Sequence, residues 1–352
     1  MLLDRTTLSR ALNNAARIAS SRATLPVLAN VKLARVGADL YLQATDLERG
    51  LEQRIAIPVP GDDFSTTVNA RMLADTVNAL DAAFVELKLN ERGTKLSVEG
   101  GRAALELPTI PASEFPPFAP MPPVRSEVDA AAFADAASRV MMAASTEEAL
   151  PVMQGVYCDG QAMAATDGFR IHIAPFVIGK ANIPARSMAE AVKLFGKAQF
   201  LTVASAGGQW FVSDNETTLI SQVIEGNFPD WRAIEPKDHK ATIEFQVQPL
   251  LAALKRVQII QPADNVVRLD FTDGITITGQ SEETGAAEDR VDAVVTGAPP
   301  MIAVNVRFFV QALEAVRINP ARLHVNQANT PLVVEDGSGW RAVVMPMHLE
   351  GK

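Results

Sequence analysis

Apolar positions along the chain follow two spacings, that of an amphipathic helix and that of a half-buried strand. Residues 8, 12, 15 and 19 are all apolar, and this i, i+4, i+7, i+11 pattern predicts a first helix. Strands are predicted at residues 27–33 and 40–43, with a turn at residues 37–39. A second helix is predicted to start near residue 68, and strands at residues 85–89 and 95–98 complete a helix–strands–helix–strands unit.

This plan occurs more than once. Residues 44–49 (Ala-Thr-Asp-Leu-Glu-Arg) return as residues 165–170 (Ala-Thr-Asp-Gly-Phe-Arg). Residues 25–31 return as residues 150–156, again upstream of the first landmark. Two landmarks that recur in the same order indicate a duplicated structural unit, about a third of the chain in length.

A third, more diverged unit has helical patterns around residues 250–257 and from Asn305 onward, with a hairpin across Asp273-Gly274 between them. The proline-rich run at residues 116–123 is typical of an interdomain linker. We therefore predict an α+β chain of three similar domains, each with two helices packed on antiparallel sheets. The predicted boundaries are residues 1–122, 123–241 and 242–352.

The second helices of the three units align on Arg71, Arg186 and Arg307. Apolar residues follow each arginine at two, six and nine positions, which is one helical face, so the arginine points away from the sheet. Arg186, Lys193 and Lys197 continue as a positive stripe along one helix, and Arg10 and Arg17 form a shorter one. A solvated face explains such a stripe, but its repetition on equivalent helices also indicates a shared charged surface.

Composition and charge narrow the class of protein. The 352 residues are 48% apolar and 21% charged, as in ordinary soluble proteins, and the net charge of −9 by itself argues against a nucleic-acid binder. Neither a signal peptide nor an apolar run long enough to cross a membrane is recognisable, so we expect no membrane contact. The single cysteine, Cys158, fits a buried, inert thiol in a reducing cytoplasm.

The sequence gives little support to an enzyme. Asp46 and Asp167 occupy equivalent places in separate repeats, so we interpret them as turn residues that cap local backbone rather than as a catalytic pair. The four histidines are scattered and lack the spacing of a metal site. Phosphate-binding and nucleophile-elbow motifs are also missing, so we expect neither catalysis nor a cofactor or metal.

Four stretches together resemble the beta subunit of bacterial DNA polymerase III, the sliding clamp. They are residues 22–28 (Arg-Ala-Thr-Leu-Pro-Val-Leu), 165–170, 225–231 (Glu-Gly-Asn-Phe-Pro-Asp-Trp) and 343–349 (Val-Val-Met-Pro-Met-His-Leu). The resemblance runs over essentially the whole chain. It implies three DNA-clamp domains per chain and a head-to-tail homodimer, a ring of six domains around double-stranded DNA.

In such a ring, helices line the hole and sheets form the outer wall and the joints. Basic side chains on the inner helices would attract phosphates without reading bases, which reconciles a DNA-binding role with the acidic total. The candidate DNA-binding residues are Arg10, Arg17, Arg22, Arg71, Arg186, Lys193, Lys197 and Arg307. Candidates for the joint between domain one and domain three of the partner are Leu105, Leu107, Ile259 and Ile260.

The resemblance also implies a hydrophobic groove between domains two and three. It would bind short linear peptides of the DNA polymerase III catalytic subunit, the clamp loader and repair proteins. The residues carried over to this groove are Met153, Thr166, Gly168, Phe169, Arg170, Ile171, Pro236, Phe308, Pro331, Val343, Val344, Met345, Pro346, Met347, His348 and Leu349. The competing hypothesis is a clamp-like paralogue that binds peptides, as a scaffold or inhibitor, without encircling DNA.

Overall fold

The computed structural model describes residues 1–20, 25–57, 61–260 and 262–347. The chain divides into two compact units. Unit 1 holds residues 1–130 and 193–223, and unit 2 holds residues 131–192 and 224–352. Within the described ranges, no helix has both the length and the apolar character needed to cross a membrane.

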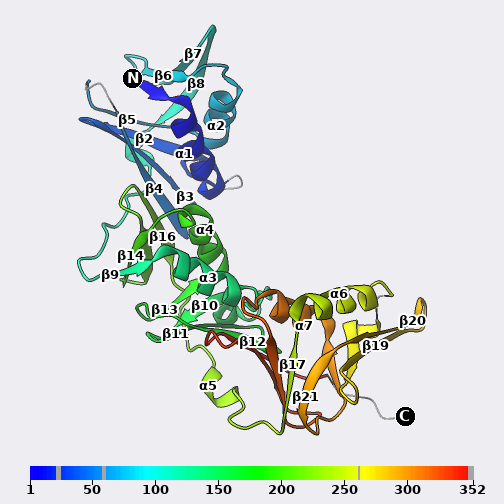
Figure 1. Ribbon diagram of the computed structural model, residues 1–352. Helices are drawn as coiled ribbons and strands as arrows, with labels where there is room; N and C mark the ends of the chain where they lie inside the picture. The colour runs from blue at the N-terminus through cyan, green and yellow to red at the C-terminus, as the bar shows by residue number, and fades with distance from the viewer. Residues whose placement is uncertain (21–24, 58–60, 261, 348–352) are drawn as a thin grey trace. The chain divides into compact units, whose positions relative to one another are not determined.

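Unit 1 is built on one continuous antiparallel ladder of twelve strands (Figure 1). In spatial order they are β1 (Leu2–Asp4), β6 (Phe84–Leu89), β7 (Lys95–Gly100), β8 (Ala103–Pro111), β5 (Phe64–Asn69), β2 (Asn30–Val36), β3 (Asp39–Thr45), β4 (Arg49–Ala56), β16 (Thr217–Gln222), β15 (Gln209–Ser213), β14 (Phe200–Ala206) and β9 (Ser126–Asp129). Helices α1 (Arg5–Ile18) and α2 (Ala70–Ala79) pack on each other, and α1 also packs on β3 and β4. Asp4 and Asn69 cap the first turns of α1 and α2 with their side-chain oxygens, which satisfies backbone N–H groups that a helix start leaves open.

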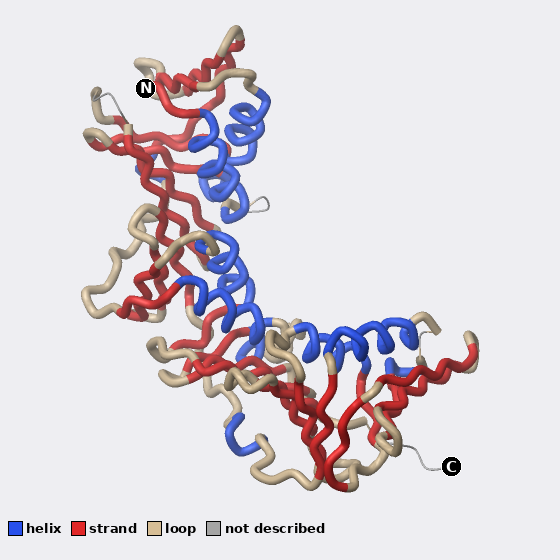
Figure 2. The backbone as a smooth tube through the Cα atoms, viewed as in Figure 1, coloured by secondary structure: helices blue, strands red, loops and turns tan. Residues whose placement is uncertain are grey.

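Unit 2 contains a nine-stranded and a four-stranded antiparallel sheet. The larger runs β13 (Ala181–Pro184), β10 (Gly155–Cys158), β11 (Ala162–Thr166), β12 (Arg170–Pro175), β25 (Arg341–Val344), β24 (Leu332–Glu335), β23 (Ala321–Val325), β17 (Ala241–Phe245), β21 (Ala293–Gly297). The smaller runs β20 (Gly285–Val291), β19 (Ile275–Ser281), β18 (Val266–Asp270), β22 (Ile302–Asn305). The helices are α3 (Ala130–Met141), α4 (Ala185–Phe195), α5 (Trp231–Ile234), α6 (Val247–Gln258) and α7 (Val306–Glu314). Except for α5, the helices of each unit lie on one side of its strands (Figure 2).

The six long helices confirm the predicted helix pattern. Arg71, Arg186 and Arg307 are exposed, as expected for residues opposite the buried face of α2, α4 and α7. The apolar residues on that face are buried except for Val192 and Val316, which are half-buried, and Leu73 and Phe309 are fully inaccessible to solvent. The sequence repeat therefore corresponds to a structural one: α2, α4 and α7 each bury the equivalent apolar face and expose the equivalent arginine.

One predicted strand is partly wrong. Residues 27–29 belong to a 3₁₀ helix, η1 (Pro26–Ala29), and the strand begins only at Asn30. Pro26 has a fixed φ and lacks a backbone N–H, which suits the first turn of a helix and not a central strand. The second copy starts with the same element, η3 (Pro151–Gln154), so the proline marks the same helical turn in both copies.

The repeated Ala-Thr-Asp landmark is a hairpin turn, as predicted. The Asp46 carboxylate accepts bonds from the N–H groups of Glu48 and Arg49, at 3.0 and 2.6 Å. The Asp167 carboxylate does the same for the next turn, with N–H donors two and three residues on, at 3.0 and 3.1 Å. Each aspartate also pairs with the arginine that begins the next strand. These contacts account for both aspartates as turn residues.

The proline-rich run between the first two predicted domains is more than a linker. It carries no helix or strand, but Phe118 within it packs against the sheet. Its ring lies 6.1 Å from that of Phe115 and so close to Gly50 that a Cβ there would sit 3.1 Å from a ring carbon. Van der Waals packing therefore holds this segment on the sheet.

Candidate functional site

The largest set of predicted groove residues meets where β12 pairs with β25. Ile171 lies opposite Val343 in this ladder. Past the end of β25, the Met345 N–H donates to the Phe169 carbonyl at 2.9 Å, and the Met347 N–H donates to the Ala303 carbonyl at 2.8 Å. The terminal segment therefore runs from the turn before β12 to the end of β22, all within unit 2.

Two aromatic rings and an arginine form the surface beside this segment. The Phe169 ring is 58% exposed and stacks on the half-buried Phe308 of α7, with 6.3 Å between centroids. The Arg170 guanidinium lies 4.5 Å from the Phe308 ring centroid on a buried side chain. It is held by Asp167, by the Met142 carbonyl at 2.7 Å and by Gln311. The arginine is thus already fixed, and Phe169 with Met345 supplies the exposed apolar area.

An apolar cluster continues from this surface across the sheet. Ile171, Val343 and Val333 pack with Trp231 of α5. Trp231 is a buried member of this cluster, and its position was not predicted, although the 225–231 stretch is one of the landmarks. Its signal was a large aromatic residue directly after Phe-Pro-Asp, and the neighbouring Ile234 is 46% exposed.

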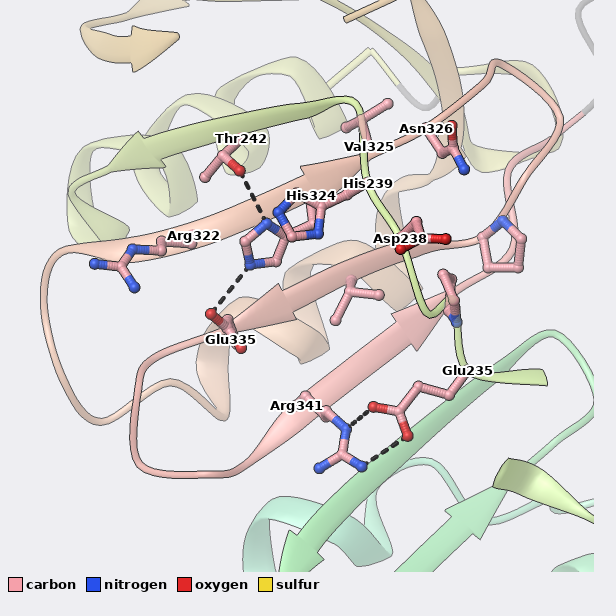
Figure 3. Close-up of a pocket in the computed structure, with 13 residues that line it drawn as sticks. Glu235, Asp238, His239, Thr242, Arg322, His324, Val325, Asn326, Glu335 and Arg341 are labelled. Carbon is pink, nitrogen blue, oxygen red and sulfur yellow. Dashed lines mark hydrogen bonds and ion pairs between the residues drawn. The ribbon is translucent and has the colours of Figure 1, made fainter. Parts of the chain in front are cut away.

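Pro236 and Pro331 lie elsewhere on unit 2. Both line a cavity of about 510 Å³ together with Val333, the histidines His239 and His324, and several charged side chains (Figure 3). Of the other predicted groove residues, Thr166 and Val344 are buried in strands, Gly168 occupies the turn with φ of 91°, and Met153 is half-buried in η3. Pro346 is half-buried, and His348 and Leu349 lie outside the described residues.

Of the predicted DNA-binding residues that the structure describes, all but Lys197 lie on helices, and Lys197 lies in the turn after α4. Arg10, Lys193, Lys197 and Arg307 are exposed, whereas Arg17 is partly buried and donates to the Asn14 side chain at 3.0 Å. In unit 1, Arg17 of α1 and Arg71 of α2 line one cavity of about 470 Å³. Arg71 also lies 3.7 Å from Asp75, which reduces its local field. Arg22 lies outside the described residues.

The residues predicted for the joint differ in how much of their side chains is exposed. Leu105 is 40% exposed on β8 and Ile259 is 76% exposed after α6, whereas Ile260 is partly buried. Leu107 is only 5% exposed, so its side chain offers little accessible area to a joint. That side chain belongs to the core of its own unit.

A buried polar cluster lies on the opposite face of the β12 ladder. Arg139 of α3 donates to the Asp336 carboxylate at 2.5 Å and to the Ser338 hydroxyl at 3.0 Å. The guanidinium lies 4.6 Å from the Trp340 ring centroid. His172 of β12 contacts Trp340 edge-on and bonds through Nδ1 to the Arg139 carbonyl at 2.8 Å. Because a carbonyl only accepts, Nδ1 carries a proton.

His172 predicts a defined pH dependence of stability. Burial lowers the pKa of His172 to about 3, from 6.5. Below pH 6.5 the unfolded chain takes up a proton that the folded chain does not, so the free energy of unfolding falls as the pH falls. Between pH 7 and pH 5 this loss is about 2 kcal/mol. We therefore expect urea unfolding to give a smaller loss of the free energy of unfolding between pH 7 and pH 5 for His172→Gln than for the wild type, by about 2 kcal/mol.

The same substitution at the exposed His239 is the matched control, and it should leave the wild-type slope in place. Equal slopes for the wild type and His172→Gln would contradict the burial of a neutral ring.

Comparison with known proteins identifies one family over almost the whole length of the chain. Three family models match in series: the N-terminal domain of the DNA polymerase III beta subunit over residues 1–119, its central domain over 127–230 and its C-terminal domain over 232–348. The beta sliding clamp of Streptomyces coelicolor is 27% identical over 99% of both chains, and that of Escherichia coli K12 is 26% identical over 93% of this chain and 94% of its own. A crystal structure of the Pseudomonas aeruginosa DnaN sliding clamp bound to griselimycin has a TM-score of 0.93, 24% identity and 99% coverage of both chains.

Three consecutive clamp domains define the class of protein, a three-domain DNA clamp. The chain belongs to the beta-subunit family of bacterial DNA polymerase III, whose curated members are beta sliding clamps. Its function is that of a DNA sliding clamp.

Proposed function

We propose that two copies of this chain join head to tail around duplex DNA and hold the replication machinery on it. The observation that carries the proposal is the succession of all three clamp domains in one chain, each presenting an exposed arginine at the same place of its second helix. We place the domain boundaries at residues 1–122, 123–241 and 242–352. The protein acts by encircling DNA, in the cytoplasm, and carries out no catalysis.

Two unpaired strand edges support the head-to-tail joint. In unit 1, β5 pairs with β8 only over residues 109–111, so among the described strands one edge of residues 103–108 has no ladder partner. In unit 2, β20 is the edge strand of the four-stranded sheet. An open edge presents backbone N–H and C=O groups that another strand can satisfy. We propose that β8 of one copy pairs with β20 of the next, with Leu105 and Ile259 in apolar contact.

The DNA contacts of the proposed ring are sparse. Arg10, Arg17, Arg71, Arg186, Lys193, Lys197 and Arg307, together with Arg22, would attract phosphates without reading sequence. Neutralisation of Arg71 by Asp75 keeps that attraction weak. Weak contacts suit a ring that is held by closure, because tight phosphate binding would oppose sliding.

We further propose that the surface around Phe169, Ile171, Phe308 and Met345 binds short linear peptides. The partners are the DNA polymerase III catalytic subunit, the clamp loader and repair proteins. Exposed aromatic and methionine side chains supply a deformable apolar surface that accepts varied ligands. A leucine or aromatic anchor buried there contributes about 2 kcal/mol or more.

Retention on circular DNA tests encirclement. Loaded onto a nicked circle by a clamp loader, the protein should stay on the circle through gel filtration and leave after the circle is cut once. A peptide-binding scaffold that never encircles DNA would not be retained in either case.

Replacing Arg186, Lys193 and Lys197 together with alanine should reduce loading roughly threefold or more, because phosphate contacts are lost. Peptide binding should stay within about twofold of wild type, because these side chains are not on the groove.

Equal retention on circular and linear DNA would contradict the ring, as would a solution mass of one protomer at high concentration. If the triple variant lost peptide binding as strongly as loading, the assignment of two separate surfaces would be wrong.

A further inference from the structure

The outer face of the nine-stranded sheet carries a continuous row of side chains that leads away from the groove. Ile171 pairs with Val343, Val343 with Val333, Val333 with His324, and His324 with Thr242. Paired residues lie on the same face of a sheet, so the row crosses β12, β25, β24, β23 and β17. It is apolar at the groove end and polar at the end that lines the cavity of Figure 3. The same face of the sheet therefore underlies both the proposed groove and the cavity.

A second row next to it alternates in charge. Arg341 pairs with Glu335 and Glu335 with Arg322, which in turn pairs with Glu244. Both arginines have carboxylate partners. Arg341 is bound by both oxygens of Glu235, and Arg322 Nε lies 3.3 Å from a Glu244 oxygen (Figure 3 shows the first pair). A negatively charged occupant would have to compete with these partners, so the cavity is poorly suited to an anion.

The Glu335 carboxylate, by contrast, has a partner that need not carry charge. His324 lies 3.0 Å from one Glu335 oxygen through Nε2 and 3.1 Å from the Thr242 hydroxyl through Nδ1. A threonine hydroxyl can donate to Nδ1, which leaves a proton on Nε2 for the carboxylate, so a neutral imidazole satisfies both contacts. In the described part of the chain Glu335 then forms no ion pair with a lysine or arginine, although Arg322 and Arg341 are its cross-strand neighbours, and its carboxylate is one-third exposed.

The rest of the cavity wall adds acceptors. Asp238 is exposed, and the side-chain oxygen of Asn326 is buried with no hydrogen-bond partner in the described part of the chain. The His239 ring covers His324, with 4.2 Å between centroids. The accessible acceptors of the wall are the carboxylates of Asp238 and Glu335, which suit an occupant that brings N–H donors and positive charge.

We propose that this cavity binds a lysine or arginine side chain of a partner peptide, next to the segment that fills the groove. The inference rests on the proposed peptide-binding function, because the shared row from Ile171 to Thr242 is what connects the two sites. A volume of about 510 Å³ accommodates either side chain. A metal ion is a poor alternative, since the described residues contain no group of three or more His, Cys, Asp or Glu side chains able to hold one. The cavity selects among partners by the charge that flanks their anchors.

Synthetic peptides test this selection. The probes are a short peptide with leucine and phenylalanine anchors, the same peptide extended by two lysines, and the same peptide extended by two glutamates, each extension placed at either end. Fluorescence anisotropy should give the wild-type protein about fivefold tighter binding of a lysine-extended peptide than of its glutamate counterpart. Glu335→Gln should reduce this preference to less than twofold and leave the unextended peptide unchanged.

Two further variants separate the cavity from the overall acidity of the chain. Glu283→Gln removes the same charge from the exposed turn between β19 and β20 and should keep the preference. Asp238→Asn, on an exposed loop residue, should lower it in part. Equal binding of the lysine and glutamate peptides by the wild type, or an unchanged preference in Glu335→Gln, would overturn the inference alone. Failure of the unextended peptide to bind would overturn the proposed groove, and the inference with it.

Discussion

Replacing Arg139 with leucine should lower the free energy of unfolding by about 3–5 kcal/mol. The Asp336 side chain is fully inaccessible to solvent, and the Arg139 side chain is 4% exposed. Removing the guanidinium leaves a buried carboxylate without its charged partner, and the desolvation of that carboxylate is no longer offset. The packing of the guanidinium on the Trp340 ring is lost as well. Urea unfolding followed by tryptophan fluorescence measures the effect.

The chain supplies its own matched control. Arg139 also lies 3.4 Å from Asp135, but that side chain is 45% exposed. Asp135→Ala should therefore cost less than about 1 kcal/mol. The double variant Arg139→Leu with Asp336→Asn should recover part of the loss, because it removes the orphaned charge. A cost below about 1 kcal/mol for Arg139→Leu alone would show that water reaches Asp336, contrary to its burial.

This ion pair also matters for the groove. It ties α3 to the turn between β24 and β25, two segments 197 residues apart in sequence. β25 contains Val343, one of the proposed groove residues, and leads directly to Met345. Under the proposed boundaries, the pair joins the second domain to the third, so we expect it to keep the two halves of the proposed groove in register.

Local features were predictable because local sequence determines them. The helices follow from apolar spacing, and the turns at Asp46 and Asp167 follow from side-chain oxygens that reach their own backbone two and three residues on. The expectation of a buried Cys158 is confirmed, and burial raises the pKa of its thiol. Repetition strengthened two of these signals, because the helix spacing recurs three times and the aspartate turn twice.

Long-range features were not predictable from the same patterns. The pairing of β4 with β16 and of β12 with β25 joins strands from different repeats, and the sequence alone does not specify which edges meet. His239 and His324 were read as scattered, although the fold stacks their rings. Leu105 and Leu107 share a strand face by alternation and both pair with β7, yet only Leu107 is buried, a difference that alternation does not predict.

Replacing Phe169 with alanine should weaken binding of an anchor peptide by about 30-fold, or about 2 kcal/mol. Phe169 is the most exposed of the aromatic residues that surround the groove, and its ring rests on Phe308 rather than on a bound partner. A peptide side chain placed over that stack would bury apolar area on both rings. The bond that the Phe169 carbonyl accepts from Met345 uses backbone atoms and survives the change. Fluorescence anisotropy with a labelled peptide that carries leucine and phenylalanine anchors measures the loss.

Phe200 provides the matched control, because it is a phenylalanine of similar exposure, 49% against 58%, on β14 of unit 1. Phe200→Ala should leave peptide affinity within about twofold of wild type, as expected for a remote and independent site. Once loaded onto circular DNA, Phe169→Ala should stay on it as long as the wild type, since closure of the proposed ring does not involve the groove. The loading step itself should be weakened, because the clamp loader is one of the proposed groove partners. Equal losses of peptide affinity in the two variants would mean that exposed phenylalanines bind the probe non-specifically. An affinity of Phe169→Ala within twofold of wild type would move the binding surface away from the Phe169–Phe308 stack.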